Sequence, residues 1–190
     1  MTNWYEPYDS PEEAYVSWFL DELVEGGYVK EYVSQPPATV LSIKKRYRWV
    51  KRLKTKEKDM YGTLLQEHVY TPDFKVLWRK GIGVFYKDII DIGSDKDAPF
   101  CVKRFVWGDG DTSIWEVKPL FDRNNMTRLF TINQKWMYDK YGIYVQKIIP
   151  QKLFEATFTP KKYLLTDMGK QKRKLTFAPR TLEEYVKSRE

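Results

Sequence analysis

The chain has 190 residues and a formal charge of +7, from 33 Lys and Arg against 26 Asp and Glu. A hydrophobic fraction of 42% excludes a disordered chain, and the length suits one compact domain with a short extension. The excess of positive charge favours a polyanionic partner such as nucleic acid.

The chain has a single cysteine and a single histidine, Cys101 and His68. This excludes an intramolecular disulfide and any zinc site with the usual Cys and His ligand set. We expect Cys101 to be a small buried hydrophobe and His68 to be structural. No apolar run approaches the ~18 residues of a membrane span. We therefore expect a soluble protein with no membrane partner. Its expected location is a reducing compartment, the cytoplasm, which could be that of a phage-infected host.

The first predicted element is a helix from Pro11 to about Glu25. Ser10 is a favourable N-cap, proline suits the first helical position, and Gly26-Gly27 can form the exit. Apolar residues near helical spacing form its expected buried stripe, namely Ala14, Trp18, Phe19 and Leu23.

A long strand is predicted over residues 39–53, where the pattern has a period of two. The face expected to pack carries Leu41, Ile43, Tyr47, Trp49 and Leu53. The other face is basic, and residues 44–56 contain eight Lys or Arg. A solvated strand edge is one explanation, but such dense charge favours a phosphate-tracking DNA surface, made by Lys44, Arg46, Arg48 and Arg52. Tyr47 and Trp49 are interpreted as core residues, not as base-stacking platforms.

Residues 55–63 are expected to connect this strand to another at 65–78. An inserted hairpin made of two extended segments is expected over residues 79–111. A strand at 112–118, a helix at 127–141 and a strand at 143–149 are expected to follow it. The helix offers Leu129, Phe130, Trp136 and Met137 for burial. Residues 151–190 are expected to be a basic extension with a short terminal helix, because Thr181 and Glu184 fit a capping box. The basic cluster 170–174 is either a second DNA contact or a tail.

The residues that indicate chemistry are Asp73 on one strand and Glu116-Val117-Lys118 on another. Alternation places Glu116 and Lys118 on the same face, roughly 6 to 7 Å apart along the strand. With Asp73 on the neighbouring strand, two carboxylates and the Val117 carbonyl could hold Mg²⁺ or Mn²⁺ beside a phosphate, and Lys118 would assist the attacking water.

These residues resemble the motifs of the PD-(D/E)XK nuclease superfamily. The resemblance covers Pro72-Asp73, Glu116-x-Lys118, a leading helix with Ser10-x-x-Glu13, and the following Gln35-Pro36. It implies a restriction-endonuclease-like α/β fold over residues 1–150, with an αβββαβ core and a mixed central sheet.

The resemblance also implies a Mg²⁺-dependent DNA endonuclease. Asp73 and Glu116 would be metal ligands, Glu13 an auxiliary ligand, Lys118 the group beside the nucleophile, and Gln134 or Lys135 a further polar site residue. The long interval between Asp73 and Glu116 departs from the family's compact pattern, and the insertion at 79–111 would account for it.

Several alternatives stay open at this point. Glu13 fits a helix cap as well as a metal ligand. The fold could belong to an inactive DNA-binding or assembly protein, or to a basic module that binds a protein. Cleavage of both strands would suit a homodimer or a partner nuclease of a recombination system. The sequence does not distinguish junction, duplex, transposon-end and single-stranded substrates.

Overall fold

The computed structural model describes residues 3–79, 86–88, 102–107, 110–121, 126–166 and 171–189. Most of the expected insertion, including Cys101, lies outside the described residues, as does Lys170. The chain divides into two compact units, one of residues 1–36 and 72–190 and one of residues 37–71.

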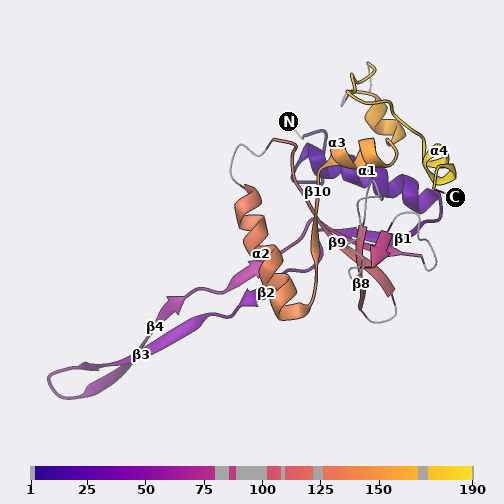
Figure 1. The fold of residues 1–190 in the computed structure, drawn as a ribbon. Coiled ribbons are helices and arrows are strands. Elements are labelled where there is room, and N and C mark those ends of the chain that lie inside the picture. Colours follow the sequence, from indigo (N-terminus) through magenta and orange to yellow (C-terminus); the bar gives the residue numbers. More distant parts are fainter. Residues whose placement is uncertain are drawn as a thin grey trace. The chain divides into compact units, whose positions relative to one another are not determined.

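The larger unit is a mixed α/β structure whose sheet contains both parallel and antiparallel pairs (Figure 1). Strand β9 (Gly110–Val117) is central. Along one edge it pairs antiparallel with β6 (Phe74–Trp78), which pairs in turn with β1 (Val29–Ser34). Along the other edge it pairs antiparallel with β8 (Val102–Trp107) and parallel with β10 (Val145–Ile148). The predicted α/β class with a mixed sheet is confirmed.

The insertion was expected to be a hairpin, and that expectation is wrong for the strands that can be described. Strand β7 (Tyr86–Asp88) pairs with β8 in parallel, so the two cannot be joined by a tight turn.

Helix α1 (Pro11–Glu25) begins and ends where its local sequence predicts. The Ser10 hydroxyl oxygen accepts the N–H of Glu13 at 3.2 Å, which satisfies one of the open N–H groups of the first turn. At the other end Gly27 adopts φ +78°, a conformation that glycine reaches without steric cost. Local capping chemistry therefore fixes both ends of this helix.

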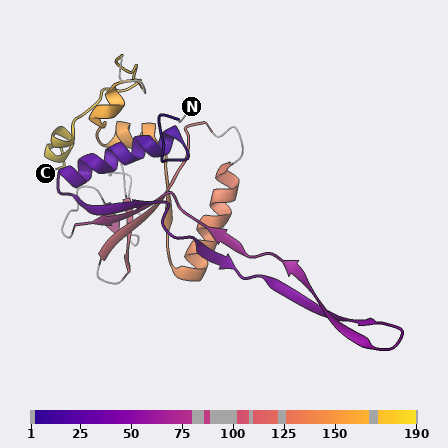
Figure 2. The ribbon, with the colours of Figure 1, turned by 180° about the vertical axis from the view of Figure 1, so that it is seen from behind.

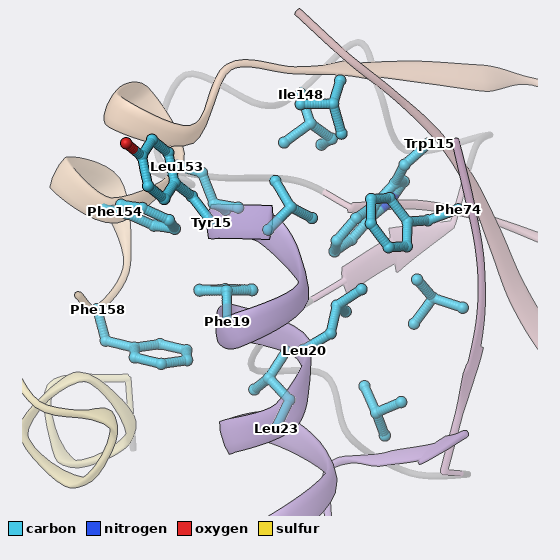
Figure 3. Packing of buried hydrophobic residues seen from close by; sticks show 14 of the residues in the cluster. Tyr15, Phe19, Leu20, Leu23, Phe74, Trp115, Ile148, Leu153, Phe154 and Phe158 are labelled. Atoms are coloured by element: carbon cyan, nitrogen blue, oxygen red, sulfur yellow. The ribbon is translucent and has the colours of Figure 1, made fainter. Parts of the chain in front are cut away.

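The core forms between α1, the sheet and α3 (Pro150–Ala156), as Figure 3 shows. Phe19 of α1 stacks on Phe158 with ring centroids 4.3 Å apart. The ring of Phe154, from α3, is also stacked with that of Phe19, at a centroid distance of 5.9 Å. Phe74 and Trp115, from the paired strands β6 and β9, are fully buried in the same cluster. Their backbones are therefore held rigidly at the place where the strands reach Asp73 and Glu116.

The carboxy-terminal residues, predicted to form a basic extension from residue 151, contribute to this core. Helix α3 and the short helices η2 (Lys161–Leu164) and α4 (Leu182–Lys187) contribute buried residues to the same cluster as α1. Those residues are Leu153, Phe154, Tyr163, Leu182 and Tyr185, and Phe158, which lies between α3 and η2, joins them. The predicted capping box is confirmed, because Thr181 Oγ1 accepts the N–H of Glu184 and the Glu184 carboxylate accepts the N–H of Thr181.

Helix α2 (Met126–Tyr141) follows β9 and packs beside β10, in the predicted order. Phe130 and Met137 are buried as expected. Leu129 and Trp136 were expected to be buried but are exposed, because only one side of α2 packs against the sheet.

The smaller unit consists of two separate strand pairs (Figure 2). Strands β2 (Thr39–Ser42) and β5 (His68–Tyr70) form one pair, and β3 (Lys45–Arg52) and β4 (Glu57–Leu65) form the other. The single strand predicted over 39–53 is thus two strands, and the expected loop at 55–63 is largely β4. We call residues 45–65 the basic ribbon.

Candidate active site

The candidate active site lies where β6 begins and β9 ends. Phe74 is paired with Trp115, so Asp73 stands one residue before this pair on one strand and Glu116 one residue after it on the next. The N–H of Asp73 donates to the carbonyl of Trp115 at 3.1 Å, which continues the strand contact by one residue. Antiparallel register therefore brings together two carboxylates that are 43 positions apart in the sequence.

Each of these carboxylates has a partner from the Glu116-Val117-Lys118 segment. The N–H of Val117 donates to Asp73 Oδ2 at 2.6 Å. The Lys118 ammonium donates to Glu116 Oε1 at 2.6 Å, and both side chains are only 11% exposed. Alternation along the strand predicts that Glu116 and Lys118 share a face, and this contact agrees with it.

Glu13, at the start of α1, is buried and acts as part of the helix cap. Its carboxylate accepts the Ser10 hydroxyl at 2.7 Å and the N–H of Asp9 at 3.4 Å. In a standard capping box this carboxylate would accept the N–H of the N-cap residue, Ser10. Here it accepts the Ser10 hydroxyl and the N–H of Asp9 instead. The same carboxylate interacts electrostatically with Asp73 and with Lys118, which places it beside the site.

Burial, and after it neighbouring negative charge, perturbs the protonation of Asp73. Burial, then the neighbouring Glu116 carboxylate, raise the pKa of Asp73 to about 7, against the lowering effect of the Val117 hydrogen bond. Burial also raises the pKa of Glu13. Among the described residues, the Lys118 ammonium interacts with all three of these carboxylates, and an additional cation would further relieve their repulsion.

The donor set suits a hard cation held by two carboxylates. Within the described part of the chain, no three His, Cys, Asp or Glu side chains are gathered as a metal-holding group, so Glu13 is not placed as a third ligand. Mg²⁺ is commonly bound through one or two carboxylates and retains several waters. Asp73 and Glu116 meet that requirement, because the strand register brings them together and the Glu116 carboxylate raises the pKa of Asp73.

Gln134 and Lys135, the two polar site residues expected on α2, have different surroundings. The Gln134 amide nitrogen donates to the carbonyl of Val145 at 2.6 Å and so ties α2 to β10. Lys135 is exposed on α2. Among the described contacts, neither residue hydrogen-bonds to Asp73 or Glu116.

The register of β10 adds Lys147, which the sequence analysis did not identify. Lys147 is paired with Glu116 across the parallel ladder, and its side chain is exposed. Paired residues lie on the same face of a sheet, so a second lysine borders the site. Its only sequence signal is a charged residue within a strand whose other residues are uncharged.

The DNA-contacting residues predicted in this segment lie along β3 of the basic ribbon or directly before it. Lys44 directly precedes β3, and Arg46, Arg48 and Arg52 share one of its faces. Two of these arginines are ion-paired across the ribbon, with Arg48 2.7 Å from Asp59 and Arg52 2.9 Å from Glu57.

The face of the ribbon that was expected to pack is exposed, and that prediction is wrong. Tyr47 is 47% exposed and Trp49 is 40% exposed, and Ile43 and Leu53 are exposed as well. Leu41 alone of the predicted packing face is buried. A two-stranded ribbon has two faces and forms no interior of its own, so alternation here does not separate core from surface.

No known protein family, curated protein or solved structure matches this chain. None of the described helices is long and apolar enough to span a bilayer.

The raised pKa of Asp73, caused first by burial and then by the Glu116 carboxylate, predicts how stability depends on pH in metal-free protein. The folded-state pKa of about 7 exceeds the ordinary value of 3.8, so the folded chain binds this proton more tightly than the unfolded chain does. Its stabilising contribution is complete below pH ~4 and is lost as the pH rises through 7. Asp73→Asn should therefore gain free energy of unfolding relative to wild type between pH 5 and 8, on the order of 2 kcal/mol.

Urea unfolding in EDTA at several pH values measures this difference. Asp139→Asn, an equivalent change at an exposed position on α2, is the matched control and should show a difference that does not vary with pH. A gap between Asp73→Asn and wild type that stays constant from pH 5 to 8 would contradict the prediction.

Proposed function

We propose that this chain is a metal-dependent DNA endonuclease of the PD-(D/E)XK type, with a restriction-endonuclease-like fold. The observation that carries the proposal is the meeting of Asp73, Glu116 and Lys118 at the adjoining ends of two paired strands. The order α1, β1, β6, β9, α2, β10 supports it, since it follows the αβββαβ order of that superfamily.

The residues divide the chemistry of phosphodiester hydrolysis among them. Asp73 and Glu116, with the Val117 carbonyl, would hold Mg²⁺ or Mn²⁺. Such an ion polarises the scissile phosphate and lowers the pKa of a bound water. Lys118 would then lie beside the attacking water, where its ammonium offsets negative charge that develops on the phosphate oxygens. Exposed Lys147, which is paired with Glu116, would contact the phosphate backbone beside it.

The two hydrogen bonds of the site prepare this arrangement. The Val117 N–H orients the Asp73 carboxylate, and the buried ion pair orients Glu116. Phe74 and Trp115 fix the backbones from the opposite face, because both are fully buried in the core. A preorganised site loses little entropy when substrate binds.

A second candidate is an inactive DNA-binding or assembly protein with the same fold. The observation that favours it is that Asp73 and Glu116 already have partners within the chain, so neither requires a metal to be hydrogen-bonded. Basic charge on the ribbon would serve such a protein equally well.

A cleavage assay separates the two candidates. Purified chain is incubated with supercoiled, linear and four-way-junction DNA, in Mg²⁺, Mn²⁺ or EDTA. The proposal expects nicked or cut products in the metals and none in EDTA, at a rate that increases with protein concentration. DNA binding without cleavage of any substrate in either metal would favour the inactive protein.

A further inference from the structure

The two faces of the basic ribbon differ sharply in charge. By register, one face carries the three arginines Arg46, Arg48 and Arg52 together with Glu57 and Asp59. The two acidic residues leave this face with one unit of net positive charge, and both are ion-paired to arginines. The other face carries three lysines and no acidic residue, namely Lys45, Lys51 and Lys58. The stronger positive charge is therefore on the lysine face.

The same lysine face carries a pair of exposed aromatic rings. Tyr47 and Trp49 are stacked, with centroids 5.1 Å apart and planes inclined by 22°. Across the ribbon Tyr47 is paired with Gly62, and a Cβ added at Gly62 would lie 2.7 Å from the Tyr47 ring. The glycine thus leaves room for the ring to lie close against the neighbouring strand, and β4 holds Tyr47 in position.

We propose that the lysine face of the ribbon binds a single strand of nucleic acid. Unpaired bases would stack on the Tyr47–Trp49 pair, and the three lysines would contact the phosphates on either side of it. Exposed aromatic rings within a positively charged track are the combination that binds single strands without sequence preference. Lys45 and Lys51 are six residues apart on one strand, roughly 20 Å, which several consecutive phosphates of a single strand would span.

Charge and ring geometry favour this occupant over a duplex. A duplex buries the faces of its bases and presents only their edges, which are read by hydrogen-bonding side chains. The lysine face offers flat rings and flexible ammonium groups and has no Asn, Gln or Arg. The inference goes beyond the proposed cleavage and does not depend on it, because binding can be measured without metal.

The test measures the affinity of the full chain in EDTA and low salt for fluorescein-labelled oligothymidylate, oligouridylate and duplex, each about 20 nucleotides long. We expect the single strands to bind more tightly than the duplex. Equal affinity for the two homopolymers indicates a site that does not distinguish DNA from RNA. Tighter binding of one of them identifies the preferred ligand as DNA or as RNA. Tighter binding of the duplex would overturn the proposal.

Aromatic variants identify the face that binds. Tyr47→Ala combined with Trp49→Ala should weaken single-strand binding about tenfold or more, because each stacked base contributes substantially. Tyr61→Ala is the matched control, since Tyr61 is paired with Arg48 on the arginine face and is 65% exposed. It should change affinity less than twofold. Gly62→Ala keeps both rings but displaces Tyr47, and should weaken binding by an intermediate factor.

Two triple variants remove equal charge from the two faces. Replacing Lys45, Lys51 and Lys58 by Gln should reduce the slope of log affinity against log salt by about 2. The same replacement of Arg46, Arg48 and Arg52 should reduce it less, because two of these arginines are neutralised across the ribbon. An equal or larger effect of the arginine variant would overturn the assignment to the lysine face.

Photocrosslinking to the wild-type chain tests the binding face without relying on variants that could misfold. Oligothymidylate containing 5-iodouracil should crosslink to Tyr47 or Trp49, as located by mass spectrometry. Crosslinks confined to other parts of the chain would contradict the proposal, whatever the variants do.

Discussion

Asp73→Asn should lower the rate of Mg²⁺-dependent DNA cleavage by about 10³-fold or more while leaving DNA binding intact. The amide oxygen of Asn can still accept the Val117 N–H, so the local backbone contact survives. What is lost is the negative charge that, with Glu116, would hold the cation. Glu116→Gln should have a comparable effect and should also leave Lys118 without its charged partner.

A graded series around the site makes this prediction specific. Lys118→Ala should lower the rate by about 10² to 10³, as expected for the loss of one electrostatic contact to the transition state. Glu13→Gln should have a smaller effect, because its carboxylate caps α1 and influences Asp73 only through charge. Asp139→Asn, on the exposed side of α2, should leave the rate unchanged.

Loss of activity in this series can be distinguished from loss of fold. Asp73→Asn removes repulsion between carboxylates, so its melting temperature in EDTA at pH 8 should not fall below that of wild type. Titration with Mn²⁺ should show weakened metal binding in the same variant. Cleavage by Asp73→Asn at the wild-type rate, with Asp139→Asn as the reference, would remove the catalytic assignment.

A chain that ends at Pro150 should fail to fold. The truncation removes six residues of the main core, namely Leu153, Phe154, Phe158, Tyr163, Leu182 and Tyr185. Burial of each large apolar side chain contributes about 1.5 to 3 kcal/mol. Their combined loss is comparable to or larger than the 5 to 15 kcal/mol that separates typical folded and unfolded proteins. Circular dichroism should show no cooperative melting transition.

Removal of the basic ribbon is the informative comparison. Replacing residues 45–65 by a short glycine-rich turn deletes 21 residues but no member of the main core. This variant should melt cooperatively within a few degrees of wild type. Cooperative melting of the Pro150 truncation near the wild-type temperature would show that the carboxy-terminal residues do not stabilise the core.

Local signals in the sequence were sufficient for the helix ends and for one half of the site. Ser10, Gly27 and the Thr181–Glu184 box act on neighbouring backbone groups, so their effect is readable without the fold. The Glu116–Lys118 contact is equally local, because alternation along one strand places both side chains on one face. The mixed α/β class followed from the order of these elements.

Contacts between distant segments were decided only by the tertiary structure. Antiparallel register brings Asp73 close to Glu116. In the ribbon, the register places acidic residues beside Arg48 and Arg52 and places none on the lysine face. A period of two shows which residues share a face of a strand but not whether anything covers that face. For this reason the period predicts that Tyr47 and Trp49 are core residues, whereas both are exposed. Conversely, the residues after Pro150 lack a clear period and still complete the core, because burial depends on what the folded chain brings against them.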